Sequence, residues 1–298
     1  MFKKKNKNQG LYLSDKQPLS TLGKVLLVLS YVILIAWAIA IIWPLAIMVI
    51  SSFNGNQGQY ISMASKFEFS LKNFQHLFEE TDFLLWVKNT IFIAIATALL
   101  TLLIVSFTGY AYSRYRFKGK RMSLMAIMLI QTIPTFAGIT AYFAMHSIIS
   151  GVVPVFSRTA MLILIYSAGG IASNTFILKG YIDSISKELD DAAKIDGCSN
   201  FEVYRLIIMP IARPMLAIIA LWSFIGPFMD YMLPAILLTN SQDYTLATGL
   251  FTLISDIRTM NAPAFAAGGL LTAIPIIALF ISLQNQLVSG LSSGSVKG

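Results

Sequence analysis

The sequence predicts an all-α fold: a polytopic membrane protein with six transmembrane helices and one polar helix-turn-helix loop between the fourth and the fifth. The first observation is composition, because 56% of the residues are hydrophobic and only 12% are charged, with a mean hydropathy of +0.70. An ordinary soluble domain is roughly 25% charged. The second observation is that apolar runs near the roughly 20 residues needed to cross a bilayer recur six times.

The chain divides into a polar arm (1–24), a transmembrane domain (25–289) and a short polar tail (290–298). The apolar run after the arm is too long for a signal-peptide core and lacks a small-residue cleavage site. Longer hydrophilic intervals separate some of the runs, and the most polar is 183–210. We expect the six spans at about 25–52, 89–113, 122–149, 159–182, 211–238 and 265–289.

The distribution of Lys and Arg predicts the orientation of these spans. With the amino terminus in the cytoplasm, 17 of the 22 basic residues fall on the cytoplasmic side and five on the outer side. Both termini and the 183–210 loop are therefore expected to be cytoplasmic. The net charge of +8 then follows from membrane topology, and it does not indicate a nucleic-acid partner.

The sequence offers few of the residue groups that catalytic or metal sites need. Cys198 is the single cysteine, so an internal disulfide is excluded. His76 and His146 lie far apart without a cluster of other ligand types, so we expect no metal site. A phosphate-binding G-x-x-x-x-G-K-[ST] loop is missing from the sequence.

The interval 53–88 contains one amphipathic pattern, which predicts a short helix at the membrane interface. Packing of this helix onto the bundle and docking of an outer partner are both compatible with the pattern, and packing is favoured. Its apolar residues are Leu71, Phe74, Leu77 and Phe78.

Several predicted spans contain residues that depart from plain hydrophobicity. Glycines and prolines in the third, fourth and fifth spans suit close helix packing or kinks, and residues 266–269 predict a helix-packing face. Asp230 is a carboxylate in the outer half of the fifth span. It either faces a water-filled path or reaches the outer surface from a helix end, and the sequence leaves both readings open.

The polar stretch from Tyr181 to Pro214 reads YIDSISKELDDAAKIDGCSNFEVYRLIIMPIARP. Helical spacing predicts a first helix with an apolar face opposite a charged face. The glycine after this helix is expected to accept the positive φ of a sharp turn. The predicted apolar face holds Leu189, Ala192 and Ala193, the charged face holds Asp190, Asp191 and Lys194, and the turn residue is Gly197.

A second helix is expected after the turn, because Ser199 followed by Glu202 is a capping-box pattern. Pro210 is expected to mark its end. The helix would present Phe201, Tyr204 and Ile208 on one face. So polar a helix pair between two spans belongs at the membrane surface, where a partner can reach it.

These residues resemble the cytoplasmic "EAA" loop of ABC importer permeases, with ELDDAAKIDG followed by LIIMPIARP. FILKGYIDSI (176–185), YTLATGL (244–250) and GLSSGSVKG (290–298) resemble further segments of the carbohydrate-importer permeases. Taken together the chain is similar to the G-type permease subunits of maltose and maltodextrin importers. It departs from their pattern at Asp191, where Glu is usual, at Ser186, where Pro is frequent, and at residues 228–231, where W-N-E-F is frequent.

The resemblance implies a transport subunit of the bacterial cell membrane that is not itself an enzyme and binds no cofactor. A second permease would complete the path, two ATP-binding subunits would hold Mg-ATP, and an outer sugar-binding protein would deliver the sugar, expected to be a maltodextrin. The loop would act as a lever on the fourth and fifth spans. The implied ATPase-coupling residues are Glu188, Asp190, Asp191, Ala192, Ala193, Asp196 and Gly197, and the expected substrate-path residues are Asp230, Gln131 and Asn174.

Two alternatives stay open at the level of the sequence. One is import of another solute, such as a galacto-oligosaccharide or a sugar phosphate. The other is an ion-coupled secondary transporter. Such proteins usually have paired membrane-depth carboxylates or repeats of broken helices. This sequence offers one such carboxylate, Asp230, and no visible repeat, so support for this alternative is weak.

Overall fold

The computed structural model describes residues 20–56, 58–61, 66–132 and 138–294. These parts of the chain are helical, and an isolated bridge between Asn54 and Phe69 is their one pairing of extended backbone. The predicted all-α class is therefore confirmed. The helices are α1 (Thr21–Ser52), α2 (Lys72–Glu80), α3 (Phe83–Arg114), α4 (Lys120–Ile130), α5 (Ile139–Val152), α6 (Arg158–Asp183), α7 (Glu188–Ile195), α8 (Asn200–Glu202), the π-helix η2 (Val203–Ile208), α9 (Met209–Ile211), α10 (Arg213–Met229), α11 (Met232–Leu237), the 3₁₀ turn η3 (Ser241–Asp243), α12 (Leu246–Ser255) and α13 (Ala262–Gly294).

Four described helices are long and apolar enough to cross a membrane, namely α1, α3, α6 and α13. A fifth span is present if the segment 200–211 and α10, which meet at an angle of 76°, are counted together. The chain separates into two compact units, 1–47 and 48–298, so most of α1 belongs to a unit of its own. The predicted arm and tail lie largely outside the described residues, although α13 continues past the predicted boundary to Gly294.

The third predicted span, 122–149, is not one continuous helix. The structure has two shorter helices there: α4 ends at Ile130, and α5 begins at Ile139. In the sequence Pro134 follows α4 closely, and proline lacks the N–H that a continuing helix would need.

The fifth predicted span, 211–238, is also divided. α10 ends at Met229, and the carboxylate of Asp230 accepts hydrogen bonds from the N–H groups of Met232 and Leu233, at 2.9 and 3.3 Å. These bonds satisfy two donors at the start of α11, so a new helix begins there.

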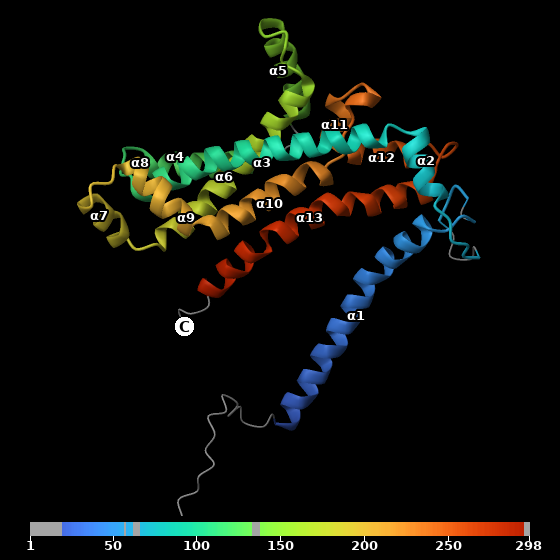
Figure 1. Ribbon diagram of the computed structural model, residues 1–298, viewed down its shortest axis with the longest axis horizontal. Coiled ribbons are helices and arrows are strands. Elements are labelled where there is room, and N and C mark those ends of the chain that lie inside the picture. Colours follow the sequence, from blue (N-terminus) through green and yellow to red (C-terminus); the bar gives the residue numbers. More distant parts are fainter. Residues whose placement is uncertain (1–19, 57, 62–65, 133–137, 295–298) are drawn as a thin grey trace, which may run out of the picture. The chain divides into compact units, whose positions relative to one another are not determined.

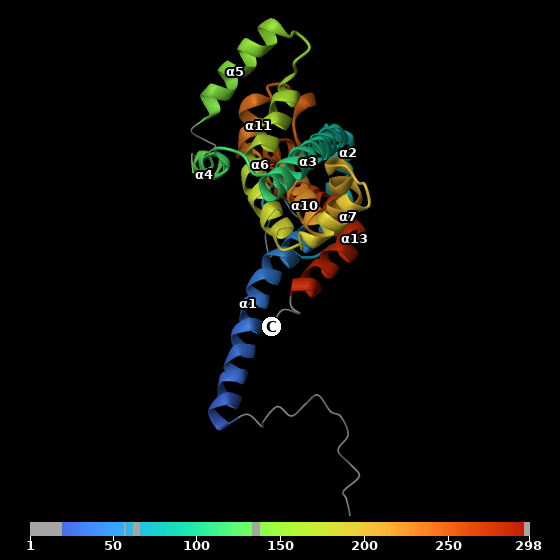
Figure 2. The same ribbon diagram turned by 90° about the vertical axis from the view of Figure 1, so that its left-hand side faces the viewer.

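In the second unit, α3 lies at the centre of the helix bundle. It packs along α6 and α10, and α13 packs on α10 (Figure 1). Figure 2, turned by 90°, shows α4 and α5 on the side of α6 that faces away from α13. The carboxyl end of α3 lies beside α7 and α8, at what we call the α7 end of the bundle, and its amino end lies beside α2 and α12, at the α12 end.

Small residues allow the helices to approach closely. A Cβ on Gly109 of α3 would lie 2.9 Å from the side chain of Leu178 on α6, so a larger residue there would require the Leu178 side chain to shift. A Cβ on Gly268 of α13 would collide with Leu250 of α12, and Ala266 and Ala267 beside it are buried. The predicted packing face at 266–269 is thus confirmed. By contrast, among the described residues nothing lies within 4 Å of a Cβ built on Gly169 or Gly226, so close helix packing does not require glycine at these two positions.

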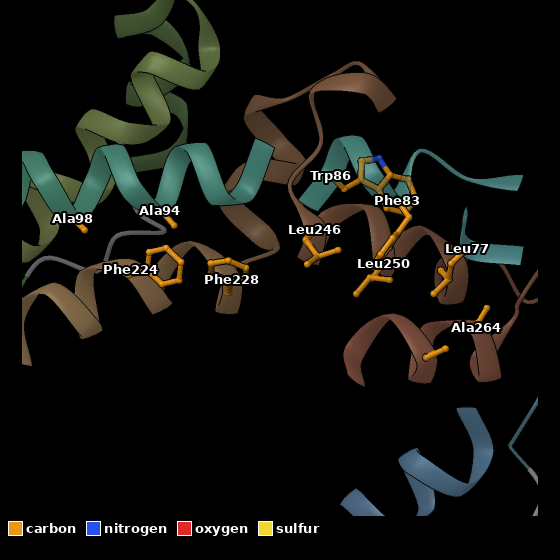
Figure 3. Close-up of a cluster of buried hydrophobic side chains, with 11 residues drawn as sticks. Leu77, Phe83, Trp86, Ala94, Ala98, Phe224, Phe228, Leu246, Leu250 and Ala264 are labelled. Atoms are coloured by element: carbon orange, nitrogen blue, oxygen red, sulfur yellow. The ribbon is translucent and has the colours of Figure 1, made fainter. Parts of the chain in front are cut away.

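The core at the α12 end joins five helices, α2, α3, α10, α12 and α13, around aromatic rings (Figure 3). Phe224 and Phe228 of α10 point toward α3, while Trp86 of α3 lies over α12. Leu77 of α2 is fully buried in the same cluster, and α2 packs on α3 and α13. The structure therefore confirms the packing role that was favoured for the amphipathic helix in 53–88.

Candidate functional site

The predicted turn between two short helices is present at the α7 end (Figure 1). Gly197 follows α7 with a φ of +91°, a conformation that residues with a Cβ rarely adopt. The N–H of Cys198 donates to the carbonyl of Ala193 at 2.9 Å, and that of Gly197 donates to Lys194 at 3.1 Å. This is the Schellman arrangement, which satisfies the last carbonyls of a helix and reverses the chain.

The capping box predicted for the second helix is also present. The N–H of Glu202 donates to Oγ of Ser199 at 3.3 Å, and the N–H of Ser199 donates to Oε2 of Glu202 at 2.7 Å. The backbone hydrogen bond from Ser199, with the side-chain bond beside it, holds the pKa of Glu202 below its usual value. The box fixes the direction in which the second helix leaves the turn.

The second helix ends one residue after Pro210, so the expected end is confirmed to within a residue. The segment runs through α8, η2 and α9 to Ile211, and the chain bends at Ala212. The expected face is only partly correct, since Ile208 and Val203 are buried and Phe201 is 56% exposed.

The predicted division of α7 into an apolar and a charged face is wrong for three residues. Asp190 is buried together with Ala193, whereas Leu189 is 44% exposed and Ala192 is exposed as well. The physical reason is a partner far away in the sequence: Nε of Arg114, the last residue of α3, lies 2.6 Å from Oδ2 of Asp190. Asp190 is therefore engaged inside the chain and is not free to offer its charge to another subunit.

The opposite side of α7 is exposed and mixes charged groups, mostly acidic, with apolar ones. Of the coupling residues expected from the sequence, all but the buried Asp190 and Ala193 are accessible on or just after α7. The exposed residues are Glu188, Leu189, Asp191, Ala192, Lys194, Ile195, Asp196 and Gly197. The structure thus brings an accessible surface to one end of the bundle.

Gln131 lies at the edge of an apolar cavity of about 740 Å³ between α4, α5 and α6. Its Nε2 donates to the carbonyl of Gly169 on α6, at 3.1 Å. Tyr142 also lines this cavity, and the remaining walls are mainly aliphatic. A sugar needs several polar partners, so the cavity in this chain alone is a poor sugar site.

No hydrogen bond is found between any two of the three expected path residues in the described parts of the chain. Asp230 accepts a hydrogen bond from the Tyr166 hydroxyl of α6 at 3.0 Å, and neither Asp230 nor Asn174 lines the cavity beside Gln131. Asp230 and Gln131 share α6 as a neighbour, through Tyr166 and Gly169. Asp230 acts in this chain as the cap of α11, which is a third reading beside the two left open by the sequence.

Sequence reasoning missed the residues of α3 that hold the helix pair. Arg114 was counted only as a topological charge, and Tyr110 and Ser113 were not singled out. The available signal was the position of Arg114 at the end of an apolar run, because an arginine that is buried there needs an acidic partner. No local pattern identifies Asp190 as its partner, because 76 residues separate them.

Comparison with known proteins places this geometry in a family. Residues 103–293 match the family model described as binding-protein-dependent transport system inner membrane component. The maltodextrin transport system permease protein MdxG of Bacillus subtilis is 39% identical over 91% of this chain and 96% of its own length. The galactooligosaccharides transport system permease protein GanQ of the same species is 38% identical over 91% of this chain and 96% of its own length.

A chain in the crystal structure of a bacterial ABC transporter, involved in the import of the acidic polysaccharide alginate, has a similar fold. The TM-score is 0.75 at 19% identity, with 89% of this chain and 98% of that chain covered. The family model spans more than half of this chain, and relatives above 30% identity span most of it. The chain therefore belongs to the family of inner-membrane permease components of binding-protein-dependent transport systems.

Proposed function

We propose that this chain is a permease subunit of an ABC importer for maltodextrins, forming the path together with a second permease. The observation that carries the proposal is the accessible helix pair at the α7 end, formed by a family member whose near relatives are named as maltodextrin permeases. Family membership removes the ion-coupled secondary transporter from consideration.

ATP binding and hydrolysis belong, in this proposal, to two separate subunits that carry Mg-ATP and dock on the exposed side of α7. Glu188 and Asp191 supply charge there, and Ala192 allows close approach. Gly197 permits the turn that presents this face. The excess of Lys and Arg in the loops on that side supports a cytoplasmic location for the helix pair and for both termini.

An outer sugar-binding protein delivers the sugar from the other side of the membrane. One similar solved structure is an alginate transporter in complex with a periplasmic protein bound to an alginate pentasaccharide. Gln131, Asn174 and Asp230 contribute to the path together with residues of the second permease.

The test is purification from the native membrane in mild detergent, followed by mass spectrometry of the co-purifying chains. We expect a second permease and an ATP-binding subunit. Recovery of this chain alone, with ATP-independent transport by the purified material in liposomes, would contradict the proposal.

The substrate needs a separate experiment, because a galacto-oligosaccharide permease is nearly as similar as the maltodextrin ones. A deletion strain is grown on maltodextrins of different length and on galacto-oligosaccharides. Loss of growth on maltodextrins supports the proposed sugar, and loss restricted to galacto-oligosaccharides transfers the assignment to the second candidate.

A further inference from the structure

The last turn of α3 contacts both sides of the linker that joins α6 to α7. Oγ of Ser113 donates to Oδ1 of Asp183 at 2.6 Å, at the end of α6. Nη2 of Arg114 donates to the carbonyl of Ile185 at 3.1 Å, in the linker itself. Nε of the same guanidinium forms the ion pair with Asp190 on α7. Arg114 of α3 thus contacts both the linker and α7, the helix that follows it.

The second helix of the pair is attached to α3 as well, one to two turns earlier. The hydroxyl of Tyr110 donates to the carbonyl of Asn200 at 3.3 Å, and the hydroxyl of Tyr204 donates to Oγ of Ser106 at 2.9 Å. The rings of Phe107 and Tyr204 stack with centroids 5.0 Å apart. Residues 106–114 of α3 therefore hold both helices of the pair.

The ion pair is distinguished among these attachments by its burial. The side chain of Arg114 is 6% exposed and that of Asp190 is 10% exposed. A buried pair is weak evidence of stability as such, but removal of one partner leaves a charge stranded in a low dielectric. A guanidinium that also binds a carbonyl resists rotation more than an ammonium on a flexible stem. The pair therefore fixes the orientation of α7 relative to α3.

We propose that Arg114 is a positioning residue that locks α7 to α3, so that displacement of the helix pair moves α3 directly. This rests on the proposed function, in which an ATP-binding subunit displaces the pair. The earlier expectation named only the fourth and fifth spans, α6 and α10, as the moving helices. Since α3 packs along both of them, one buried contact connects the displaced surface to the centre of the bundle.

The test uses the whole transporter in liposomes, with sugar uptake and ATP hydrolysis measured on the same preparation. Arg114→Gln and Asp190→Asn are expected to assemble and hydrolyse ATP while the sugar imported per ATP falls about tenfold, within the usual range of coupling energies. Arg114→Lys keeps the charge without the fork and is expected to fall between these variants and the native protein. Arg116→Gln, at an exposed neighbouring arginine, is the matched control and keeps the native ratio.

If a single variant fails to assemble, the double variant Arg114→Gln with Asp190→Asn replaces it, because neither charge is then stranded. An assembled single or double variant with an unchanged import per ATP overturns the positioning role. A native transporter that shows no ATP-driven import would instead refute the proposed function, so the two failures are distinguishable.

Discussion

Backbone conformation at single residues determines where the helix pair turns. Gly119 and Gly197 are the glycines with positive φ in the described parts of the chain, at +83° and +91°. Among the described residues, a Cβ on Gly197 would meet no atom within 4 Å. The cost of a side chain at this position is therefore backbone strain and not a collision, and strain of this kind costs about 1–2 kcal/mol.

Gly197→Asp is expected to insert and accumulate but to lose ATP-dependent sugar uptake, because strain at the turn tilts α7 and a carboxylate is added to the docking surface. Uptake in liposomes is the measurement. Gly197→Ala paired with Gly180→Ala separates strain from side-chain bulk, since both positions are open and Gly180 lacks the positive φ. Normal uptake by Gly197→Asp would disprove the role of the turn.

A second glycine is required by packing. A Cβ on Gly249 of α12 would overlap the indole of Trp86 on α3, whose Nε1 is itself held by the carbonyl of Ser241. Gly249→Ala is expected to destabilise the protein by about 1–3 kcal/mol, as overpacking does. Thermal unfolding in detergent measures this. Gly226→Ala, at an open position, is the control, and an equal loss in both variants would argue against the packing explanation.

At the scale of single elements, α11 depends on its cap. Asp230 accepts from two N–H groups of the first turn of α11 and from the hydroxyl of Tyr166. A carboxylate at membrane depth is costly, and these three donors offset that cost. The side chain of Asp230 therefore stabilises the start of α11.

Asp230→Ala is expected to destabilise α11 by about 1 kcal/mol, the typical contribution of a cap. Asp230→Asn retains an acceptor oxygen and is expected to lose less. Hydrogen exchange at the amides of Met232 and Leu233 reports the difference. Equal exchange in the alanine variant and the native protein would show that the cap does not hold α11.

For the whole molecule, the arrangement places the helix pair at one end of α3 and the aromatic core at the other. Phe224, Phe228 and Trp86 unite α10, α3 and α12 at that far end. Because closely packed interiors do not deform continuously, we expect movement at the α7 end to be transmitted as rigid tilting of helices.

ATP is expected to be the sole energy source of the assembled transporter. Sugar uptake into liposomes that contain ATP should persist when a protonophore collapses the ion gradient, and it should stop when ATP is removed. Uptake that follows the gradient while ATP stays high would exclude an ATP-driven mechanism for this chain.

Local patterns predicted the elements well where the deciding interactions are local. The Gly197 turn, the capping box of Ser199 and Glu202, and the amphipathic helix α2 each depend on residues a few positions apart. Hydropathy predicted the four long helices because the bilayer demands about 20 apolar residues regardless of what packs beside them.

The sequence by itself determined the fold class, the position of the polar helix pair and, through its resemblance, the family. Only the tertiary structure decided which side of α7 is buried, because the partner of Asp190 lies 76 residues earlier, at Arg114. It also decided where the third and fifth predicted spans divide. Hydropathy sums side chains along the chain, whereas a cap or a buried ion pair depends on atoms that meet only after the helices have packed.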